Sequence, residues 1–147
     1  MVILFLKNEL VKNMTTKKGN VIKAKKKTAI ARGTIQKGTG KVKINHIGID
    51  AYAKGYVRDL IMEPIKLAGD EMKEYDININ VNGSGFMSQA IAVRSCIAKS
   101  IVKAKGKKYK DMFLSYDRSM LVDDVRQVEE KKPLGRKARK KKQHSKR

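Results

Sequence analysis

The stretch YDININVNGSGFMSQAIAVRSCIAKSIVKAKGK, residues 75–107, decides the fold. Over residues 75–82 apolar and polar side chains alternate strictly, which predicts a strand with one buried face and one wet face. Over residues 83–107 the apolar side chains recur at spacings of three and four, which predicts an amphipathic helix. Its inward positions are Phe86, Ala90, Val93, Ile97, Ile101 and Ala104, with Ser88, Ser95, Lys99 and Lys103 opposite. A sheet with one wet face is covered by helices on a single side.

The residues before this unit predict a hairpin and a loose arm. Residues 28–36 and 41–45 alternate and are joined by a glycine-containing turn at 37–40, which indicates two antiparallel strands. Residues 1–27 begin with a short apolar patch and become basic, so we expect a poorly packed N-terminal arm. Met14 is an alternative start within it.

Two further helical regions are expected. Residues 48–70 have helical spacing, with a break at Pro64, which cannot continue a helix comfortably, and an end at Gly69. Residues 108–116 predict a short helix. From Asp117 onward the chain reads as extended and polar.

The charge points to a polyanionic partner. The 147 residues contain 35 basic and 14 acidic side chains, a net charge of +21, and such a field attracts nucleic acid or acidic membranes. No run approaches the roughly 18 to 20 apolar residues of a membrane span, and VILFL (2–6) is too short for a secretory signal core. Nucleic acid is therefore the favoured partner, and we expect no membrane contact.

The C-terminal segment concentrates this charge. Residues 131–147 hold ten basic residues and no acidic one. Like charges without a core leave a segment disordered until it exchanges counterions for RNA phosphates. A nuclear-localisation signal is the alternative reading of such a run. The small residues Gly135, Ala138 and Ser145 dilute the charge and favour close approach to RNA instead.

Few residues predict chemistry. A single cysteine, Cys96, excludes an internal disulfide and suits a reducing cytosol. With His46 and His144 it forms no zinc-binding pattern. The acidic residues are dispersed and no nucleophile–base set emerges, so we expect no metal, no cofactor and no catalysis.

The Gly83-Ser84-Gly85 turn, between the predicted strand and helix, leaves three readings open. Glycines serve a strained strand-to-helix turn for backbone reasons alone. A helix N-terminus also attracts an RNA phosphate. A nucleotide-cofactor site is the third reading, although the dinucleotide and Walker patterns are incomplete here.

Three separated motifs carry a resemblance to a known family. They are KKKTAIAR (25–32), NGSGFMSQAIAVRSCIAKS (82–100) and DVRQVEEKKPLGRKARKKKQHSKR (124–147). In order and spacing they resemble small-subunit ribosomal protein nine, a universal family, over about residues 24 to 147. The first motif is similar to the archaeal branch. Residues 1–20 have no clear counterpart, Ser84 replaces a common glycine, and His144 stands where many members carry an aromatic.

The resemblance implies a fold and a division of the chain. It implies a small sheet covered by helices on one face, like the second domain of ribosomal protein five, with a left-handed βαβ connection. A long extended basic C-terminal tail would follow. The expected parts are an N-terminal arm (1–23), a globular α+β domain (24–116) and the tail (117–147).

The resemblance also implies a function. We expect a structural protein of the small ribosomal subunit, in cytoplasmic ribosomes, that contacts neighbouring ribosomal proteins and binds ribosomal RNA in the subunit head. The residues expected to bind ribosomal RNA are Lys25, Lys26, Lys27, Arg32, Gly83, Gly85, Arg94, Lys99, Lys103, Arg126, Lys131, Lys132, Arg136, Lys137, Arg139, Lys140, Lys141 and Lys142. Those expected to contact peptidyl-site tRNA are Ser145, Lys146 and Arg147.

Two rival functions come from other classes. A free-standing, non-specific nucleic-acid compaction protein would need the charge but not the three ordered motifs. A small-molecule kinase on a related fold would need a phosphate loop with a catalytic acid.

Overall fold

A five-stranded sheet lies at the centre of the computed structural model, which describes residues 21–145. Its strands, in spatial order β1-β2-β5-β3-β4, are β1 (Ile22–Lys26), β2 (Ala29–Lys37), β5 (Tyr75–Asn82), β3 (Val42–Ile44) and β4 (Ile47–Gly48). Strand β3 runs parallel to β5, and the other neighbours are antiparallel.

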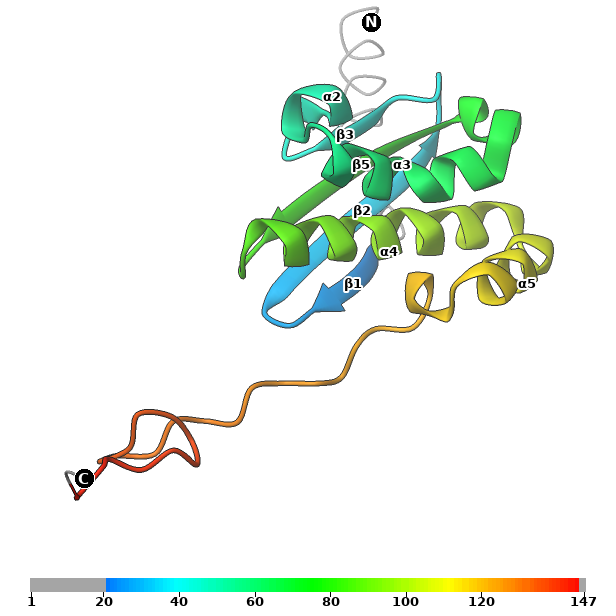
Figure 1. The fold of residues 1–147 in the computed structure, drawn as a ribbon. Coiled ribbons are helices and arrows are strands. Elements are labelled where there is room, and N and C mark those ends of the chain that lie inside the picture. Colours follow the sequence, from blue (N-terminus) through cyan, green and yellow to red (C-terminus); the bar gives the residue numbers. More distant parts are fainter. Residues whose placement is uncertain (1–20, 146–147) are drawn as a thin grey trace, which may run out of the picture.

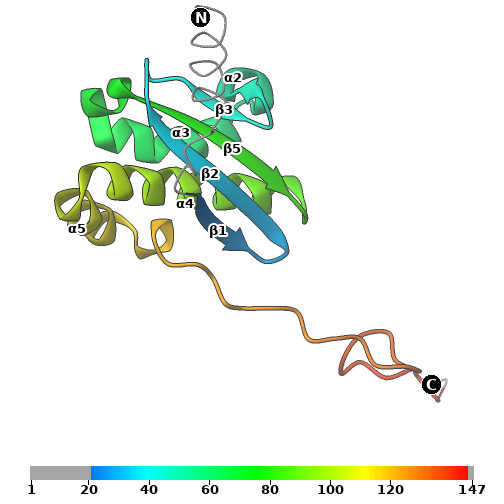
Figure 2. The same ribbon diagram turned by 180° about the vertical axis from the view of Figure 1, so that it is seen from behind.

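Helices cover one face of this sheet (Figure 1). They are α2 (Ile49–Tyr52), α3 (Tyr56–Ala68), α4 (Phe86–Lys105) and α5 (Lys107–Tyr116), with 3-10 turns η1 (Gly69–Glu74) and η2 (Arg118–Met120). The opposite face, seen from behind in Figure 2, carries no helix of the described residues. The α+β prediction with helices on a single side is confirmed.

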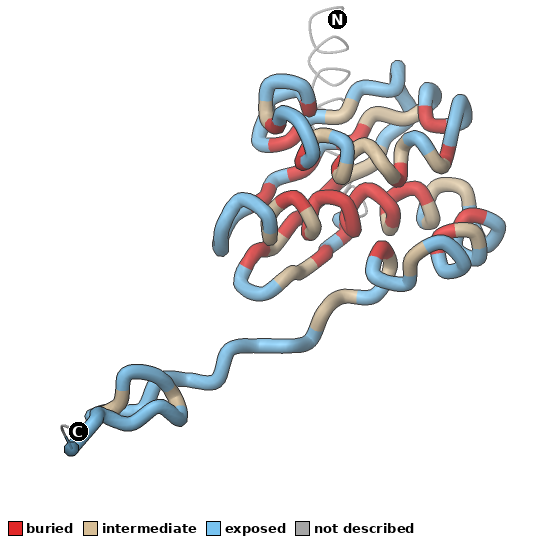
Figure 3. The backbone as a smooth tube through the Cα atoms, viewed as in Figure 1, coloured by how far each residue is buried: buried red, intermediate tan, exposed pale blue. Residues whose placement is uncertain are grey.

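The unit β5–α4 forms as predicted, with two differences on the helix. Strand β5 buries every second residue, and α4 buries a continuous stripe against the sheet (Figure 3). Phe86, predicted to face inward, is 52% exposed at the first turn of α4. Ser95, predicted to face outward, is buried because its hydroxyl donates to the carbonyl of Ser119 at 3.2 Å.

The close packing of α4 on β2 depends on small residues. Ala29 and Ala31 of β2 are fully buried. At Gly33 a Cβ would lie 2.7 Å from the Cys96 sulfur. The absence of a side chain there lets the helix axis approach the sheet, and Cys96 packs as a small core residue, as predicted.

The predicted hairpin of residues 28–36 and 41–45 is wrong. Strand β2 pairs with β5 along eight residues, and β3 lies on the far side of β5, parallel to it. The turn at residues 37–40 therefore carries the chain over the end of β5. It is held there by Asp76, whose carboxylate accepts from the backbone N–H groups of Thr39 and Lys41, each at 2.8 Å.

The connection from β3 through α3 back to β5 is left-handed, as the resemblance implied. In Figure 1 the helices face the viewer, β3 lies above β5, and β5 points to the lower left. The chain passes in front of the sheet through α3 and returns below its starting strand. Most such crossovers have the opposite hand.

Two further expectations fail. Residues 22–26, assigned to a loose arm, form the edge strand β1, in which Ile22 and Ala24 are buried. The helical region 48–70 breaks at residues 53–55, not at Pro64, which lies inside α3. Gly69 ends α3 as predicted, with φ of 66°. The rest of the predicted arm, residues 1–20, lies outside the described residues.

Candidate nucleic-acid interface

The segment after η2 leaves the domain and stays exposed. Residues 125–133 form no helix or strand and every one of them is exposed. Figure 1 shows this segment running away from the sheet, and Figure 3 shows it without a buried residue. We call residues 117–124 the tail root and residues 125–145 the tail. Residues 125–133 are thus accessible along their whole length.

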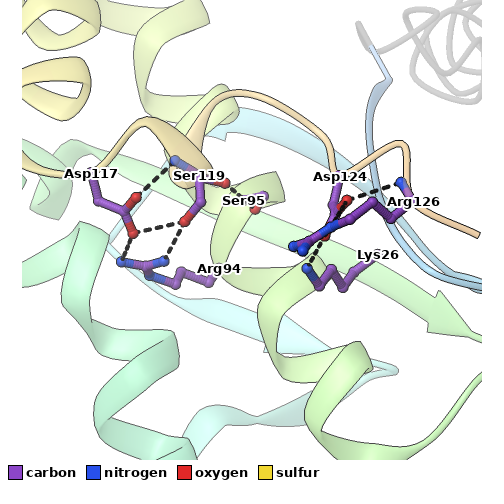
Figure 4. Close-up of polar contacts among 7 residues, drawn as sticks. All are labelled: Lys26, Arg94, Ser95, Asp117, Ser119, Asp124 and Arg126. Carbon is purple, nitrogen blue, oxygen red and sulfur yellow. Dashed lines mark hydrogen bonds and ion pairs between the residues drawn. The ribbon is translucent and has the colours of Figure 1, made fainter.

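Arg94 ties the tail root to two helices. Its guanidinium forms ion pairs with Glu63 of α3 at 2.5 Å and with Asp117 at 2.9 Å. The contact with Glu63 does not have the angles of a hydrogen bond. It also donates to the Ser119 hydroxyl at 3.3 Å. Figure 4 shows Ser119 between Arg94, Asp117 and the Ser95 hydroxyl. The tail root therefore starts from a position fixed by buried charge.

A second set of contacts holds the tail root against β1. Asp124 pairs with Lys26 at 2.5 Å and with Arg126 at 2.9 Å (Figure 4). Lys99 of α4 pairs with Asp123 at 2.7 Å. These two residues also meet the outer edge of β1: Asp123 accepts from the Lys25 N–H, and Lys99 donates to the Lys23 carbonyl.

Two carboxylates of the tail root, Asp117 and Asp124, are held in their charged form. Burial alone would raise the pKa of Asp117, but hydrogen bonds from Ser119 and Arg94 outweigh it and lower that pKa. Hydrogen bonds from Arg126 and Lys26 place the pKa of Asp124 well below its usual range. At neutral pH both acids are ionised and the contacts persist.

Farther along, the tail closes into a basic loop. Gly135 and Lys141 form an isolated antiparallel bridge, and the Arg136 N–H donates to the Lys140 carbonyl at 2.8 Å. A Cβ at Gly135 would lie 2.9 Å from the Lys137 carbonyl, so the loop needs glycine there. Arg139 pairs with Glu129 at 2.8 Å.

The structure divides the predicted RNA-binding residues into two groups. Five have their charge paired within the described chain: Lys26, Arg94, Lys99, Arg126 and Arg139. Arg94 is also buried, so its side chain is not on the surface. The cations that are exposed and make no ion pair with a described residue are Lys27, Arg32, Lys103, Lys131, Lys132, Arg136, Lys137, Lys140, Lys141 and Lys142. Lys25 is half-buried, Ser145 is exposed, and Lys146 and Arg147 lie outside the described residues.

The Gly83-Ser84-Gly85 turn has a backbone reason for its glycines. Gly83 has φ of 82° and Ser84 of 56°, both left-handed. A Cβ at Gly83 would collide with the carbonyl of Thr28, which lies in the turn between β1 and β2. The Gln89 side chain folds back from α4 and donates to the Gly83 carbonyl at 3.1 Å. This geometry favours the reading as a structural turn.

On the open face of the sheet, sequence reasoning assigned Lys25 and Arg32 to binding but none of the asparagines. Alternate residues of β5, namely Asn78, Asn80 and Asn82, are exposed there. Asn80 lies beside Arg32 of β2, and Asn78 beside Lys43 of β3. The alternation of 75–82 had marked these asparagines as the wet side. Only the strand order shows which cations stand next to them.

Two kinds of feature are not found within residues 21–145, a cluster of metal ligands and a membrane-spanning helix. No three His, Cys, Asp or Glu side chains in this range gather as metal ligands. None of its helices has the length and apolar character of a membrane span.

Comparisons with known proteins agree on one family. The family model described as ribosomal protein S9/S16 matches residues 24–147. A small ribosomal subunit protein uS9 from Picrophilus torridus is 47% identical over 126 residues, covering 82% of this chain and 92% of the relative. The uS9 protein of Thermoplasma volcanium is 43% identical, with the same two coverages. That of Methanococcus maripaludis strain C5 is 43% identical over 74% of this chain and 82% of its own length.

Proposed function

This chain belongs to the ribosomal protein S9/S16 family, and on that premise we propose that its tail binds ribosomal RNA in the head of the small subunit while its tip contacts peptidyl-site tRNA. The chain is a structural protein of the small ribosomal subunit that takes part in translation, and it is not an enzyme. Its expected partners are ribosomal RNA and neighbouring ribosomal proteins, within cytoplasmic ribosomes. Because the family is not a family of enzymes, the alternative function as a small-molecule kinase is rejected.

The observation that carries the RNA proposal is the contrast between the tail root and the tail. Every carboxylate of the tail root is paired with a cation of the domain or of its own segment. Beyond it, the cations of residues 131–142 are exposed, and among the described residues only Arg139 has an acidic partner. A fixed root that leads into unneutralised charge suits a segment that is threaded into RNA, where phosphates supply the missing partners.

Charge-matched variants test where the RNA is bound. Lys140→Gln/Lys141→Gln/Lys142→Gln removes three tail cations, and Lys107→Gln/Lys108→Gln/Lys110→Gln removes three exposed cations of α5. We expect the tail variant to lower affinity for a head-domain transcript of small-subunit ribosomal RNA and to flatten the salt dependence by about two log units per log unit of salt. The α5 variant should bind nearly as the parent does. Equal losses in both would indicate non-specific compaction of nucleic acid.

The tRNA contact is tested at the tip. An arginine at the end of a flexible lead makes a two-pronged phosphate contact that a lysine cannot copy. Deleting Ser145 to Arg147 should leave subunit assembly intact, because the other tail cations still hold ribosomal RNA. The off-rate of peptidyl-site tRNA should rise, and Arg147→Lys should reproduce part of that rise. Unchanged tRNA affinity and off-rate in normally assembled subunits would make the tip an anchor in ribosomal RNA only.

A further inference from the structure

The open face of the sheet presents a row of amides flanked by cations. The ladder register places Arg32 of β2 beside Asn80 on one side and Lys23 on the other. It places Asn78 between Thr34 of β2 and Lys43 of β3. Directly paired residues of neighbouring strands hold their side chains about 5 Å apart on the same face. Two polar rows therefore cross the sheet side by side.

These amides contribute little to the fold. Asparagine is depleted in strands because it packs poorly on a pleated surface, yet Asn78, Asn80 and Asn82 occupy three alternate positions of β5, a strand with neighbours on both sides. All three side chains are exposed, and none makes a hydrogen bond to another residue within 21–145. Three residues that strands disfavour, with no contacts that would stabilise the fold, indicate a functional surface.

The field over this face is positive. Lys23, Arg32 and Lys43 are exposed there and make no ion pair with a described residue. The carboxylate on the same side of β5 is Asp76, and its Oδ1 already accepts two backbone N–H bonds of the turn at residues 37–40. The face thus combines cations, which attract phosphates, with amides, which donate and accept, and none of these side chains is paired within residues 21–145.

We propose that this face, centred on Asn78, Asn80 and Arg32, binds the minor groove of a ribosomal RNA helix. The shallow, wide minor groove of A-form RNA displays 2′-hydroxyls, which donate and accept as amides do, between two phosphate strands. No aromatic side chain of the described strands lies among these residues to stack on an unpaired base. A face of amides between cations suits a helix rather than a single strand. The inference rests on the proposed binding of ribosomal RNA. It gives the protein a second RNA-binding surface, separate from the tail.

The decisive variant replaces the amides without harming the strand. Asn78→Thr/Asn80→Thr/Asn82→Thr removes all three amides and inserts a residue that strands favour, so the melting temperature should be unchanged or higher. Affinity of the full chain for the head-domain transcript should fall at least about tenfold, as three lost hydrogen bonds require. Arg32→Gln/Lys43→Gln should flatten the salt slope by about 1.5. Lys107→Gln/Lys108→Gln is the control of equal charge.

A second readout identifies the groove. Hydroxyl-radical cleavage attacks ribose hydrogens exposed in the minor groove of paired RNA. With the parent chain it should be reduced along one helix of the transcript, and that protection should disappear with the threonine variant while the tail's protections remain. If the variant binds with parental affinity and the same protections, the inference is overturned. If it binds RNA normally but enters subunits poorly, the face docks a neighbouring protein instead, which also overturns it. Failure of the parent chain to bind the transcript at all would count against the proposed function itself.

Discussion

The guanidinium of Arg94, in the middle of α4, lies 2.9 Å from the carboxylate of Asp117, where the tail root begins. The same side chain reaches Glu63 of α3, so one buried cation joins two helices to the start of the tail. Because the tail itself makes few contacts with the domain, this junction sets the point and direction in which it leaves. Arg94 thereby positions the start of the tail root.

Arg94→Ala should lower the free energy of unfolding by about 2–3 kcal/mol. The substitution leaves Glu63 and Asp117 without their cation, although both acids are partly exposed and so lose less than a fully buried pair. Urea denaturation measures this loss, and amide exchange should accelerate over residues 117–124. Arg118→Ala, at an exposed arginine of η2, is the control and should change neither. If Arg94→Ala speeds exchange no more than that control, the junction does not hold the tail root.

Acid should detach the tail root. The pKa values of Asp117 and Asp124 are lowered in the folded protein, so their contacts stabilise it above the ordinary carboxyl pKa of about 4. That stability is lost as the pH falls through the lowered values. Below about pH 4, amide hydrogen exchange of residues 117–126 should therefore speed up relative to the exchange of amides in α4. Asp117→Asn should show part of the same loosening at pH 7. A tail root equally protected at pH 3 and pH 7 would contradict the assignment.

Gly33→Ala should destabilise the protein, and Cys96→Ala should rescue it. An added Cβ at Gly33 meets the Cys96 sulfur at 2.7 Å, a contact that must be relieved by a shift of α4. Overpacking of this kind costs about 1–3 kcal/mol. Removing the sulfur makes room, so the double variant should be more stable than Gly33→Ala alone. Additive losses in a double-mutant cycle would show that the two residues are not in contact.

Cys96 should be chemically inert in the folded protein. Burial is the main cause that raises the pKa of its thiol to about 11, so almost no thiolate exists at pH 8, and the thiolate is the reactive form. Alkylation by iodoacetamide should proceed only as fast as the chain unfolds, and it should speed up in urea. Rapid labelling of native protein would contradict this packing.

Deletion of residues 131–147 should leave the domain folded, because the buried residues all lie upstream. The thermal midpoint should move little. Affinity for ribosomal RNA should drop, and the salt slope should change by about four if five phosphate contacts are lost. In the free full-length chain, amides of this segment should exchange rapidly. Strong protection of residues 131–145 without RNA, or an unchanged slope, would remove the tail from the interface.

Local pattern was sufficient where one element carries its own signal. The alternation of residues 75–82 predicted β5 to the residue, and the spacing after it predicted α4. Strand partners were not predictable in this way. The turn at 37–40 has the composition of a hairpin turn, but the pairing is decided by β5, which offers two edges and takes β2 on one and β3 on the other.

Charged residues concealed two structural features. Strand β1 has only Ile22 and Ala24 to bury, and its lysines read as RNA ligands on a loose arm. Arg94 read as an RNA ligand because its partners come from residues 63 and 117, far away in sequence. Both features depend on contacts between distant segments, which one-dimensional periodicity does not encode.

The ion pair of Lys99 and Asp123 has a consequence for the life of the chain before assembly. An edge strand with free N–H and C=O groups invites other chains to add to the sheet. On β1 this pair occupies the Lys25 N–H and the Lys23 carbonyl, and at the other edge β4 is only two residues long. Over the described residues, newly made copies therefore present no long edge on which to stack. The tail root thereby protects the edge of β1 against pairing with other chains before assembly.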